Sequence, residues 1–184
     1  MACCPITSTS NQTSLRLALV AGVSLGLTMD KKTAFQDQIP NNYCFGCGPE
    51  NSNGLQIKSY WLSENEAICT FIPSPYHSAG PARYLNGGVI STIIDCHCIC
   101  TAIAKGYHSS GREIGTGENI WFATGKLEIT FIKPAAIDRE VVINAKIVDE
   151  KESKITLDCQ LFSEGIVCSE GHVVAVRVPN SWFE

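Results

Sequence analysis

The chain has 184 residues, of which 45% are hydrophobic and 17% are charged, and its formal net charge at pH 7 is −4. This composition excludes a disordered chain, and this length is enough for one domain with a complete hydrophobic core. No block of basic residues occurs, which argues against nucleic acid as a ligand, because binding a phosphate backbone needs a clustered basic face.

Residues 1–29 differ in composition from the rest of the chain. They contain one basic residue, Arg16, no acidic residue, and an apolar run from Leu17 to Leu27. The run is too short to span a bilayer but has the length of a signal-peptide core. Three interpretations stay open: a secretory signal, an organelle transit peptide, and an extension ahead of a true start at Met29. We exclude this segment from fold reasoning and expect it to be poorly ordered.

Residues 30–54 are predicted to form an irregular N-terminal arm, because "CFGCGPENSNGL" (residues 44–55) is dense in turn-forming residues. Cys44 and Cys47 have the spacing of a metal-binding pair. A structural zinc site needs four ligands, however, and no second C-x-x-C follows. Neighbouring cysteines later in the chain would point in different directions from a helix. We therefore expect no metal and no cofactor.

The placement of the ten cysteines argues against a disulfide scaffold. Cys69, Cys159 and Cys168 fall within strand-like runs, and three more crowd the apolar segment at residues 96–100. Unpaired cysteine behaves as a small hydrophobic residue, so this pattern indicates buried free thiols in a reducing compartment. We expect a cytoplasmic protein, with targeting to an organelle by residues 1–29 as the alternative.

The domain at residues 55–180 begins with two alternating runs between Leu55 and Ile72, which predict two strands joined by a turn. A long loop with three prolines follows over residues 73–85. The segment from Gly87 to Lys105 then predicts a helix that is apolar on nearly every face. Such a helix must be enclosed by the protein. It carries an acidic residue and is not expected to span a membrane.

Four more strands are predicted after a Gly/Ser-rich loop, and short links between them are typical of an antiparallel meander. Their ranges are 121–133, 139–148, 155–162 and 166–178. The order is two strands, one apolar helix and four strands. This order predicts an α+β fold in which an antiparallel sheet of about six strands wraps around one long central helix.

Three motifs carry a resemblance to a known family. The first is Asn86-Gly87-Gly88 followed by Asp95, the second is "TGKLEITFIKP" at residues 124–134, and the third is the prelude "CFGCGPENSNGL". Over residues 40–178 the chain resembles the hotdog-fold acyl-CoA thioesterases, especially the branch of phenylacetyl-CoA thioesterases. The resemblance implies a homodimer or homotetramer with its sites between subunits, and an acyl-CoA or aryl-CoA substrate.

Asp95 lies two helical turns after Gly88 in the predicted helix, on one stripe. The first amides of a helix have no internal partners, and the missing Cβ atoms of Gly87 and Gly88 let a ligand oxygen approach them. We interpret the Gly88 N–H as an oxyanion donor and Asp95 as the base or nucleophile that attacks a thioester. The alternative is a structural Asp95 that pairs with a cation across the dimer or bonds to loop amides.

The resemblance also implies roles for two neighbours. Thr124 stands where relatives carry Ser or Thr and would hold the water or the Asp95 carboxylate. Asn86 replaces the usual His and can form hydrogen bonds but cannot transfer a proton; a plain N-cap is the alternative. His97 would lie about 200° around the helix from Asp95, so we expect a core or interface histidine. His77 is expected on a surface loop, with a gating role as the alternative.

Three basic residues flank the 124–134 strand and its turn. In relatives the phosphates of CoA lie across such a surface, so Lys126, Lys133 and Arg139 are candidate substrate contacts. The alternative is a solvated charged face. The expected activity is hydrolysis of an acyl-CoA thioester. Two other functions stay open: a non-catalytic protein that binds an acyl or aryl ligand, and an enoyl-thioester hydratase, against which the Asn86 replacement counts.

Overall fold

The computed structural model describes residues 33–183, and this part of the chain, including the described residues of the predicted arm, belongs to one compact unit. The predicted leader, residues 1–29, lies outside the described residues. One long helix, α2 (Gly87–Ser109), dominates the chain, and short 3-10 helices mark the arm, the loop before α2 and the C-terminal end. They are η1 (Phe35–Gln38), η2 (Pro75–His77) and η3 (Asn180–Phe183).

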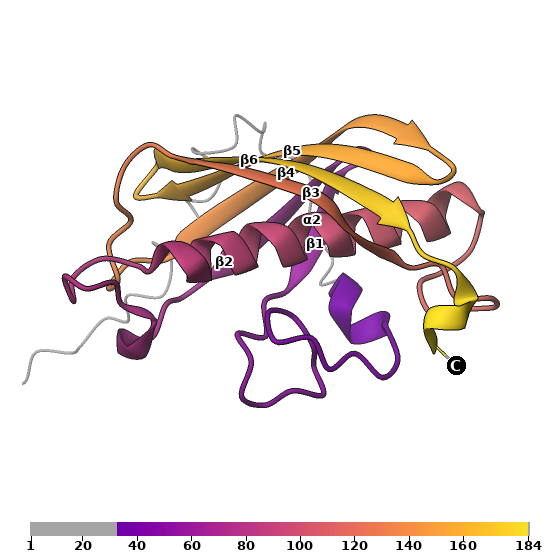
Figure 1. Cartoon of the computed structure of the whole chain (residues 1–184), viewed down its shortest axis with the longest axis horizontal. Coiled ribbons are helices and arrows are strands. Elements are labelled where there is room, and N and C mark those ends of the chain that lie inside the picture. Colours follow the sequence, from indigo (N-terminus) through magenta and orange to yellow (C-terminus); the bar gives the residue numbers. More distant parts are fainter. Residues whose placement is uncertain (1–32, 184) are drawn as a thin grey trace, which may run out of the picture. The chain divides into compact units, whose positions relative to one another are not determined.

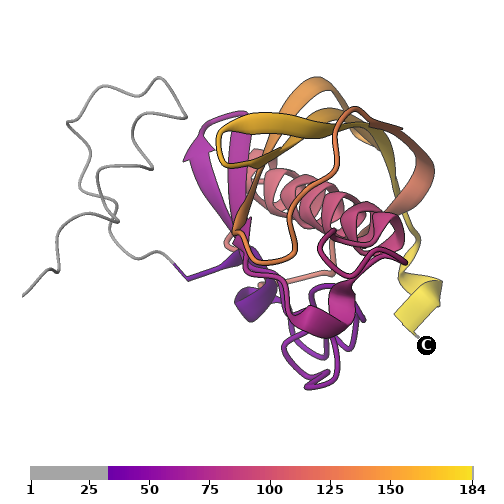
Figure 2. The same cartoon turned by 90° about the vertical axis from the view of Figure 1, so that its left-hand side faces the viewer.

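Six strands form one antiparallel sheet in the order β1-β2-β4-β5-β6-β3. The sheet curves over α2, as the end-on view in Figure 2 shows, and the arm lies on the side of α2 away from the sheet (Figure 1). The predicted α+β fold with one long helix inside a six-stranded antiparallel sheet is confirmed. The strands are β1 (Ser59–Ser63), β2 (Glu66–Phe71), β3 (Phe122–Phe131), β4 (Val141–Lys151), β5 (Lys154–Ser163) and β6 (Ile166–Arg177).

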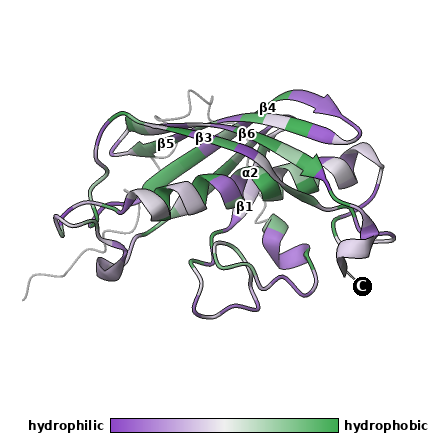
Figure 3. Cartoon of the chain, viewed as in Figure 1, coloured by the Kyte–Doolittle hydropathy of each residue, from purple (hydrophilic) through white to green (hydrophobic). Residues whose placement is uncertain are grey.

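The helix is enclosed because it has no polar face to give to water. Ile93, Ile94 and Ile103 are fully buried, and they share one core cluster with hydrophobic residues of the strands. Figure 3 shows hydrophobic residues, in green, along both the helix and the strands. By length and composition α2 could cross a membrane, but 61% of its most apolar window is buried inside the domain. Its apolar character is therefore that of a core helix.

The predicted meander is correct for β4, β5 and β6 but wrong for β3. β3 pairs with β6 at the opposite edge of the sheet, so β3 and β4 are not neighbours. The link between them bonds to the loop before α2 instead of making a hairpin: Leu85 N–H donates to Ala135 O at 2.9 Å, and Ile137 N–H donates to Arg83 O at 3.0 Å. The strand at residues 124–134 is thus an edge strand of this chain.

Two predicted boundaries also move. β1 begins at Ser59 rather than near Leu55, because Gln56 has a positive φ of 51° and Ile57 N–H donates to Gly46 O in the arm. The helix continues past Lys105 to Ser109. Gly106 is accommodated within it, because a Cβ there would lie 2.8 Å from the Ile120 side chain, so the missing side chain lets the helix pack closely.

A buried hydrogen-bonded chain ties the arm to β1 and α2. The Gln36 side chain donates to Ser59 Oγ and accepts from the Ser59 amide, both at 2.8 Å. Ser59 Oγ lies 2.8 Å from His97 Nδ1, and His97 Nε2 lies 3.3 Å from Ala67 O. Because a carbonyl only accepts, the proton sits on Nε2. Burial lowers the pKa of His97 to about 4, so the ring is neutral, as expected for a core histidine.

Ser59→Ala should lower the free energy of unfolding by about 1–3 kcal/mol, because it leaves the buried His97 Nδ1 and the Gln36 amide without their hydroxyl partner. Chemical denaturation followed by circular dichroism measures this change. Ser63→Ala, at the exposed end of the same strand, is the control and should be nearly neutral. Equal stability of the two variants would contradict the structural role of this network.

Candidate active site

Asp95 is half-buried on α2, where the helix faces the start of β3. Thr124 Oγ1 donates a hydrogen bond of 2.5 Å to Asp95 Oδ1. Within residues 33–183 of one chain, no Lys, Arg or His forms an ion pair with Asp95. The structure therefore brings together the acid and the hydroxyl that the resemblance pairs, while their part in catalysis stays a prediction.

A local irregularity of β3 accompanies the Thr124 contact. The register with β6 shifts between Thr124 and Lys126, so Gly125 forms a bulge. A Cβ at Gly125 would lie 2.8 Å from the Val176 side chain, and glycine is the residue that fits without moving it. A bulge at this point re-aims the strand, so that Thr124 meets the helix.

The environment of Asp95 favours its protonated form. Burial raises the pKa of this carboxyl, and the Thr124 hydrogen bond opposes the shift in part. A carboxylate whose pKa is raised holds a proton more strongly than a free one. This property suits a group that must take a proton from water.

The helix begins at a cap formed by Asn86. Its Oδ1 accepts from Gly88 N–H at 2.7 Å and from Val89 N–H at 3.3 Å, so the N-cap interpretation of Asn86 is confirmed. The predicted oxyanion donor, Gly88 N–H, is therefore already engaged. The Gly87 N–H has no hydrogen-bond partner among residues 33–183. It is the amide that the structure presents freely at this helix end.

The amides of Gly87 and Gly88 do not lie beside Asp95 of the same chain. Seven residues separate Gly88 from Asp95, which corresponds to about 10 Å along a helix axis. The intervening hydroxyls are used within the helix: Ser91 Oγ and Thr92 Oγ1 each donate at 2.9 Å to the carbonyl four residues earlier. One chain thus holds two half-sites on one helix.

The three basic candidates are exposed and are not gathered at Asp95. Lys126 pairs with Glu128 at 2.9 Å, and Arg139 pairs with Glu164 at 3.2 Å. Lys133 follows the far end of β3, where its amide donates to Cys168 O at 3.0 Å. A shared role in binding phosphate stays a prediction.

His97 and His77 both form hydrogen bonds within the domain. His97 belongs to the buried network described above and faces away from Asp95. The expectation of a surface position for His77 is wrong: its side chain is buried against Phe71, and its Nδ1 accepts from the Ser74 amide at 3.0 Å. Burial also lowers the pKa of His77.

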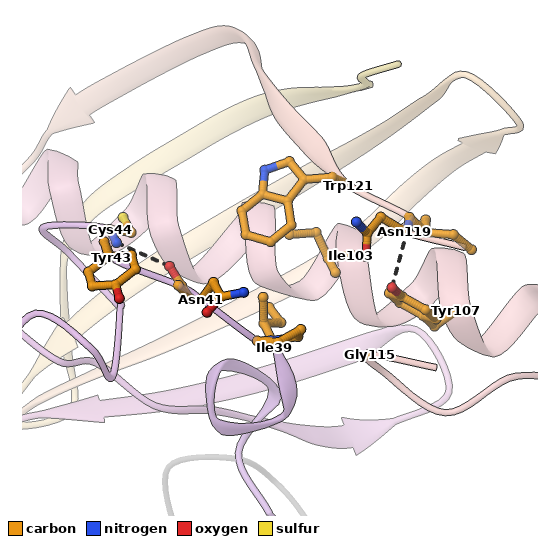
Figure 4. Close-up of a pocket in the computed structure, with 12 residues that line it drawn as sticks. Ile39, Asn41, Tyr43, Cys44, Ile103, Tyr107, Gly115, Asn119 and Trp121 are labelled. Atoms are coloured by element: carbon orange, nitrogen blue, oxygen red, sulfur yellow. Dashed lines mark hydrogen bonds between the residues drawn. The ribbon is translucent and has the colours of Figure 1, made fainter. Parts of the chain in front are cut away.

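A pocket of about 550 Å³ lies between the arm, the second half of α2 and the segment before β3 (Figure 4). Ile103 and Trp121 form its apolar wall, and Tyr107 OH accepts from Ile120 N–H at 3.2 Å beside it. Asp95 does not line this pocket, but Ile103 lies eight residues further along the helix, on the same side. The contribution of the arm to this pocket was not predicted from the sequence.

A cluster of thiols is the group among residues 33–183 whose placement suits a metal ion. The sulfur atoms of Cys44, Cys47 and Cys96 all lie within 4.8 Å of one another. Sequence reasoning missed this arrangement because it searched for a second C-x-x-C. The signal that could have found it is the helical spacing of Cys96 and Cys100, which places both on one face of α2.

Comparison with solved structures identifies the architecture as the hotdog fold. A thioesterase superfamily protein from Shewanella loihica is 28% identical, with 71% of this chain and 97% of that chain covered and a TM-score of 0.53. The PaaI protein from the phenylacetic acid degradation operon of E. coli is 13% identical (68% and 81% covered, TM-score 0.56). A hypothetical thioesterase from Streptococcus pneumoniae, solved with coenzyme A, is 12% identical (66% and 85% covered, TM-score 0.55).

Residues 83–169, which include α2 and β3 to β5, match the family model of the Thioesterase superfamily. This segment of the chain is similar to the Thioesterase superfamily, and the fold around it is the hotdog fold. A search of curated proteins found no match. The similarity to PaaI is too low to show more than a shared fold, so membership of the phenylacetyl-CoA branch stays a prediction.

Asn86→Ala should lower the free energy of unfolding by about 1 kcal/mol, because the amides of Gly88 and Val89 lose their cap. Asn86→Asp is the matched variant and should keep most of the stability, since a carboxylate also caps and favours the positive end of the helix dipole. Thermal denaturation of the three proteins checks the ranking. A stability of Asn86→Ala equal to that of the unmodified chain would show that the cap contributes nothing.

Proposed function

We propose that this protein is an acyl-CoA thioesterase that hydrolyses a thioester to a free acid and CoA. The observation that carries the proposal is Asp95, the one acidic residue of α2, which is half-buried, bonded to Thr124 and without an ion pair among residues 33–183. The match of residues 83–169 to the Thioesterase superfamily model supports the reaction class, and the coenzyme A in the Streptococcus pneumoniae structure supports CoA as the carrier. We place the protein in the cytoplasm, in keeping with its free thiols.

The proposed reaction uses Asp95 as a base. The carboxylate takes a proton from water while the water oxygen attacks the thioester carbonyl, and the carbonyl oxygen becomes negatively charged. The intermediate then expels the CoA thiolate, which receives the proton from Asp95. In the alternative route the carboxylate attacks the carbonyl directly, and water hydrolyses the resulting anhydride. Thr124 would orient the carboxylate through its 2.5 Å hydrogen bond in either case.

Two copies of the chain are needed to complete this site. An amide that stabilises the oxyanion and a base that delivers water must both reach one carbonyl, but Gly88 and Asp95 of one helix are about 10 Å apart. We infer a homodimer in which the helix N-terminus of one subunit faces Asp95 of its partner; a tetramer of such dimers stays open. The exposed edge of β3 supports this arrangement, because it carries Leu127 and Phe131, which are 37% and 55% exposed.

The oxyanion donor of this proposal is the helix N-terminal amide pair, with Gly87 N–H as the freely presented member. Gly88 N–H can join only if Asn86 Oδ1 shares or releases it. Each good donor would stabilise the oxyanion by about 3 kcal/mol. The Asn86 cap also supports the rival function, a non-catalytic protein that binds an acyl group, because Asn86 Oδ1 already occupies the Gly88 N–H that was predicted to bind the oxyanion.

The hydratase alternative has no support from the site. That chemistry needs a histidine able to exchange protons beside the carboxylate. His97 is held by Ser59 and Ala67 on another side of α2, and His77 is held by the Ser74 amide. Lys126, Lys133 and Arg139 remain proposed contacts for the phosphates of CoA. The pocket lined by Ile103 and Trp121 is the proposed space for the acyl group.

Asp95→Asn should reduce turnover of a cleavable acyl-CoA by about 100-fold or more, because an amide cannot take the proton from water. Free thiol released from a panel of aliphatic and aromatic CoA esters measures turnover, and binding of CoA esters should persist. Asp138→Asn, at an exposed turn, is the control and should keep full activity. Unchanged turnover in Asp95→Asn would end the catalytic proposal. Loss of crotonyl-CoA absorbance without thiol release would indicate a hydratase.

Heterodimers test whether each site uses two subunits. Gly87→Pro removes the free N–H, and Asn86, with φ −66° and ψ 135°, already has the conformation that a residue before proline prefers. A purified heterodimer of Gly87→Pro and Asp95→Asn should keep about half of the wild-type activity, since one of its two sites is intact. Both homodimers should be nearly inactive.

Gly87→Ala is the control for the proline variant. It keeps the amide proton and adds a Cβ that would lie 3.3 Å from the Phe131 ring, so it tests the steric effect alone. An inactive heterodimer beside an active Gly87→Ala homodimer would contradict a site shared between subunits.

A further inference from the structure

Two cysteine pairs from distant parts of the sequence meet where the arm crosses α2. Cys44 Sγ lies 3.5 Å from Cys96 Sγ, and Cys47 Sγ lies 3.6 Å from Cys100 Sγ. We call Cys44, Cys47, Cys96 and Cys100 the thiol cluster. Three of its members are buried and Cys44 is half-buried, so the sulfurs face one another rather than solvent.

Each pair is presented by a local geometry that suits a shared ligand. Cys44 and Cys47 lie on a tight turn that is closed by a hydrogen bond of 2.8 Å from Gly48 N–H to Cys44 O. Cys96 and Cys100 are four residues apart on α2, so their side chains point from one face in successive turns. A pair on a turn and a pair on a helix are a common source of four zinc ligands.

The chain around the cluster is shaped to bring the sulfurs together. Gly46 lies directly over the helix, because a Cβ at this position would be 2.3 Å from Cys96 Sγ and 2.8 Å from the Thr92 side chain. The Asn42 side chain is 2% exposed and donates from Nδ2 toward Cys47 Sγ at 3.8 Å. Donors of this kind are what a buried thiolate requires around it.

Packing by large side chains does not account for the position of the turn at residues 43–47. Tyr43 and Phe45, which flank Cys44, are 67% and 57% exposed, so the turn presents its aromatic rings to solvent and its sulfurs to the helix. The stretch between η1 and β1 has no helix or strand of its own. Irregular segments of this length usually need a specific anchor.

We propose that the thiol cluster is a structural zinc site with four cysteine ligands, which fastens the arm to the central helix. Four sulfurs about 2.3 Å from one tetrahedral ion lie about 3.8 Å from one another, close to the Cys44–Cys96 and Cys47–Cys100 contacts. Cys44, Cys47 and Cys96 lie within 4.8 Å of one another, and Cys100 approaches this group through Cys47. Four protein ligands leave no open position for substrate, so the ion's role is structural. An iron–sulfur cluster fits less well, because its four cysteines are divided among two or four irons, so that the cysteine sulfurs of different irons lie further apart.

The site would also support the proposed acyl pocket. Cys44 lines this pocket together with residues 39–43 of the arm, opposite Ile103 and Trp121. Figure 4 shows Cys44 and Tyr43 at one end of the pocket and Tyr107 at the other. A metal that holds Cys44 and Cys47 to the helix therefore holds one wall of the pocket. This consequence rests on the proposed function, whereas the metal site itself does not.

The test measures metal on the full chain, without an affinity tag and purified under reducing conditions. Elemental analysis should find about one zinc per chain. After removal of metal by a chelator, titration of the reduced chain with cobalt(II) should saturate at one ion and give the intense visible absorption of tetrahedral thiolate coordination. Failure of the reduced chain to bind either ion would overturn the proposal, and so would the recovery of iron with inorganic sulfide.

Variants then locate the ion. Cys100→Ala should weaken zinc binding by at least about 100-fold. Loss of a group that only orients a metal ligand costs up to about 100-fold, and loss of a ligand itself should cost at least as much. Cys98→Ala removes an equally buried thiol from the same helix, outside the cluster, and should bind zinc as the unmodified chain does. Equal zinc affinity of the two variants would overturn the site.

The same cysteine contacts could instead mark two disulfides, Cys44–Cys96 and Cys47–Cys100. Mass spectrometry of the non-reduced native chain distinguishes this outcome, since two disulfides make the chain four hydrogens lighter and leave no zinc site. That mass would overturn the proposal, and a fully reduced mass with bound zinc supports it. None of these measurements uses substrate, so an inactive thioesterase that binds zinc would separate failure of the proposed function from failure of the metal site.

Discussion

The fold depends on enclosing a helix that is apolar all round. A helix of 23 residues with Ile93, Ile94 and Ile103 on its buried faces cannot give a polar side to water, and six antiparallel strands close over it. The strands cover one side only, so the other side needs a second cover. Within residues 33–183 the arm supplies it, through Phe35 and Ile39 in the core and through the Gln36 contact with Ser59.

The same enclosure explains why one acidic residue on the helix is informative. Burial disfavours a charged carboxyl, and each ionisable group near an apolar core must gain a partner or serve a function. Asp95 gains a hydroxyl from Thr124 and no cation among residues 33–183, and it lies beside β3, the strand at the open edge of the sheet. In the proposed homodimer, a second subunit would complete both the sheet and the site at this edge.

Much of this arrangement could be predicted from sequence, because periodicity is a local property. The helix, the six strands and the Asn86 cap follow from the pattern of apolar residues and from the turn residues around them. The pairing of β3 with β6 could not be predicted, because the short link at residues 132–140 has the length of a hairpin but bonds to the loop before α2. The start of β1 was misplaced because the amides of Leu55 and Ile57 donate to carbonyl groups of the arm instead of to a neighbouring strand.

The thiol cluster was missed in the sequence because the search considered only a second pair with the C-x-x-C spacing. Cys44 and Cys47 have the spacing of a turn, whereas Cys96 and Cys100 have the spacing of one helical turn. Between Cys47 and Cys96 lie 48 residues of the sequence. Neither pair is a site alone. Only the close approach of Gly46 to the helix joins them, and this approach depends on the missing side chain at that position. Asp95 and Cys96 are adjacent on α2, so the proposed catalytic residue and the contact with the arm through Cys44 lie on the same turn of the helix.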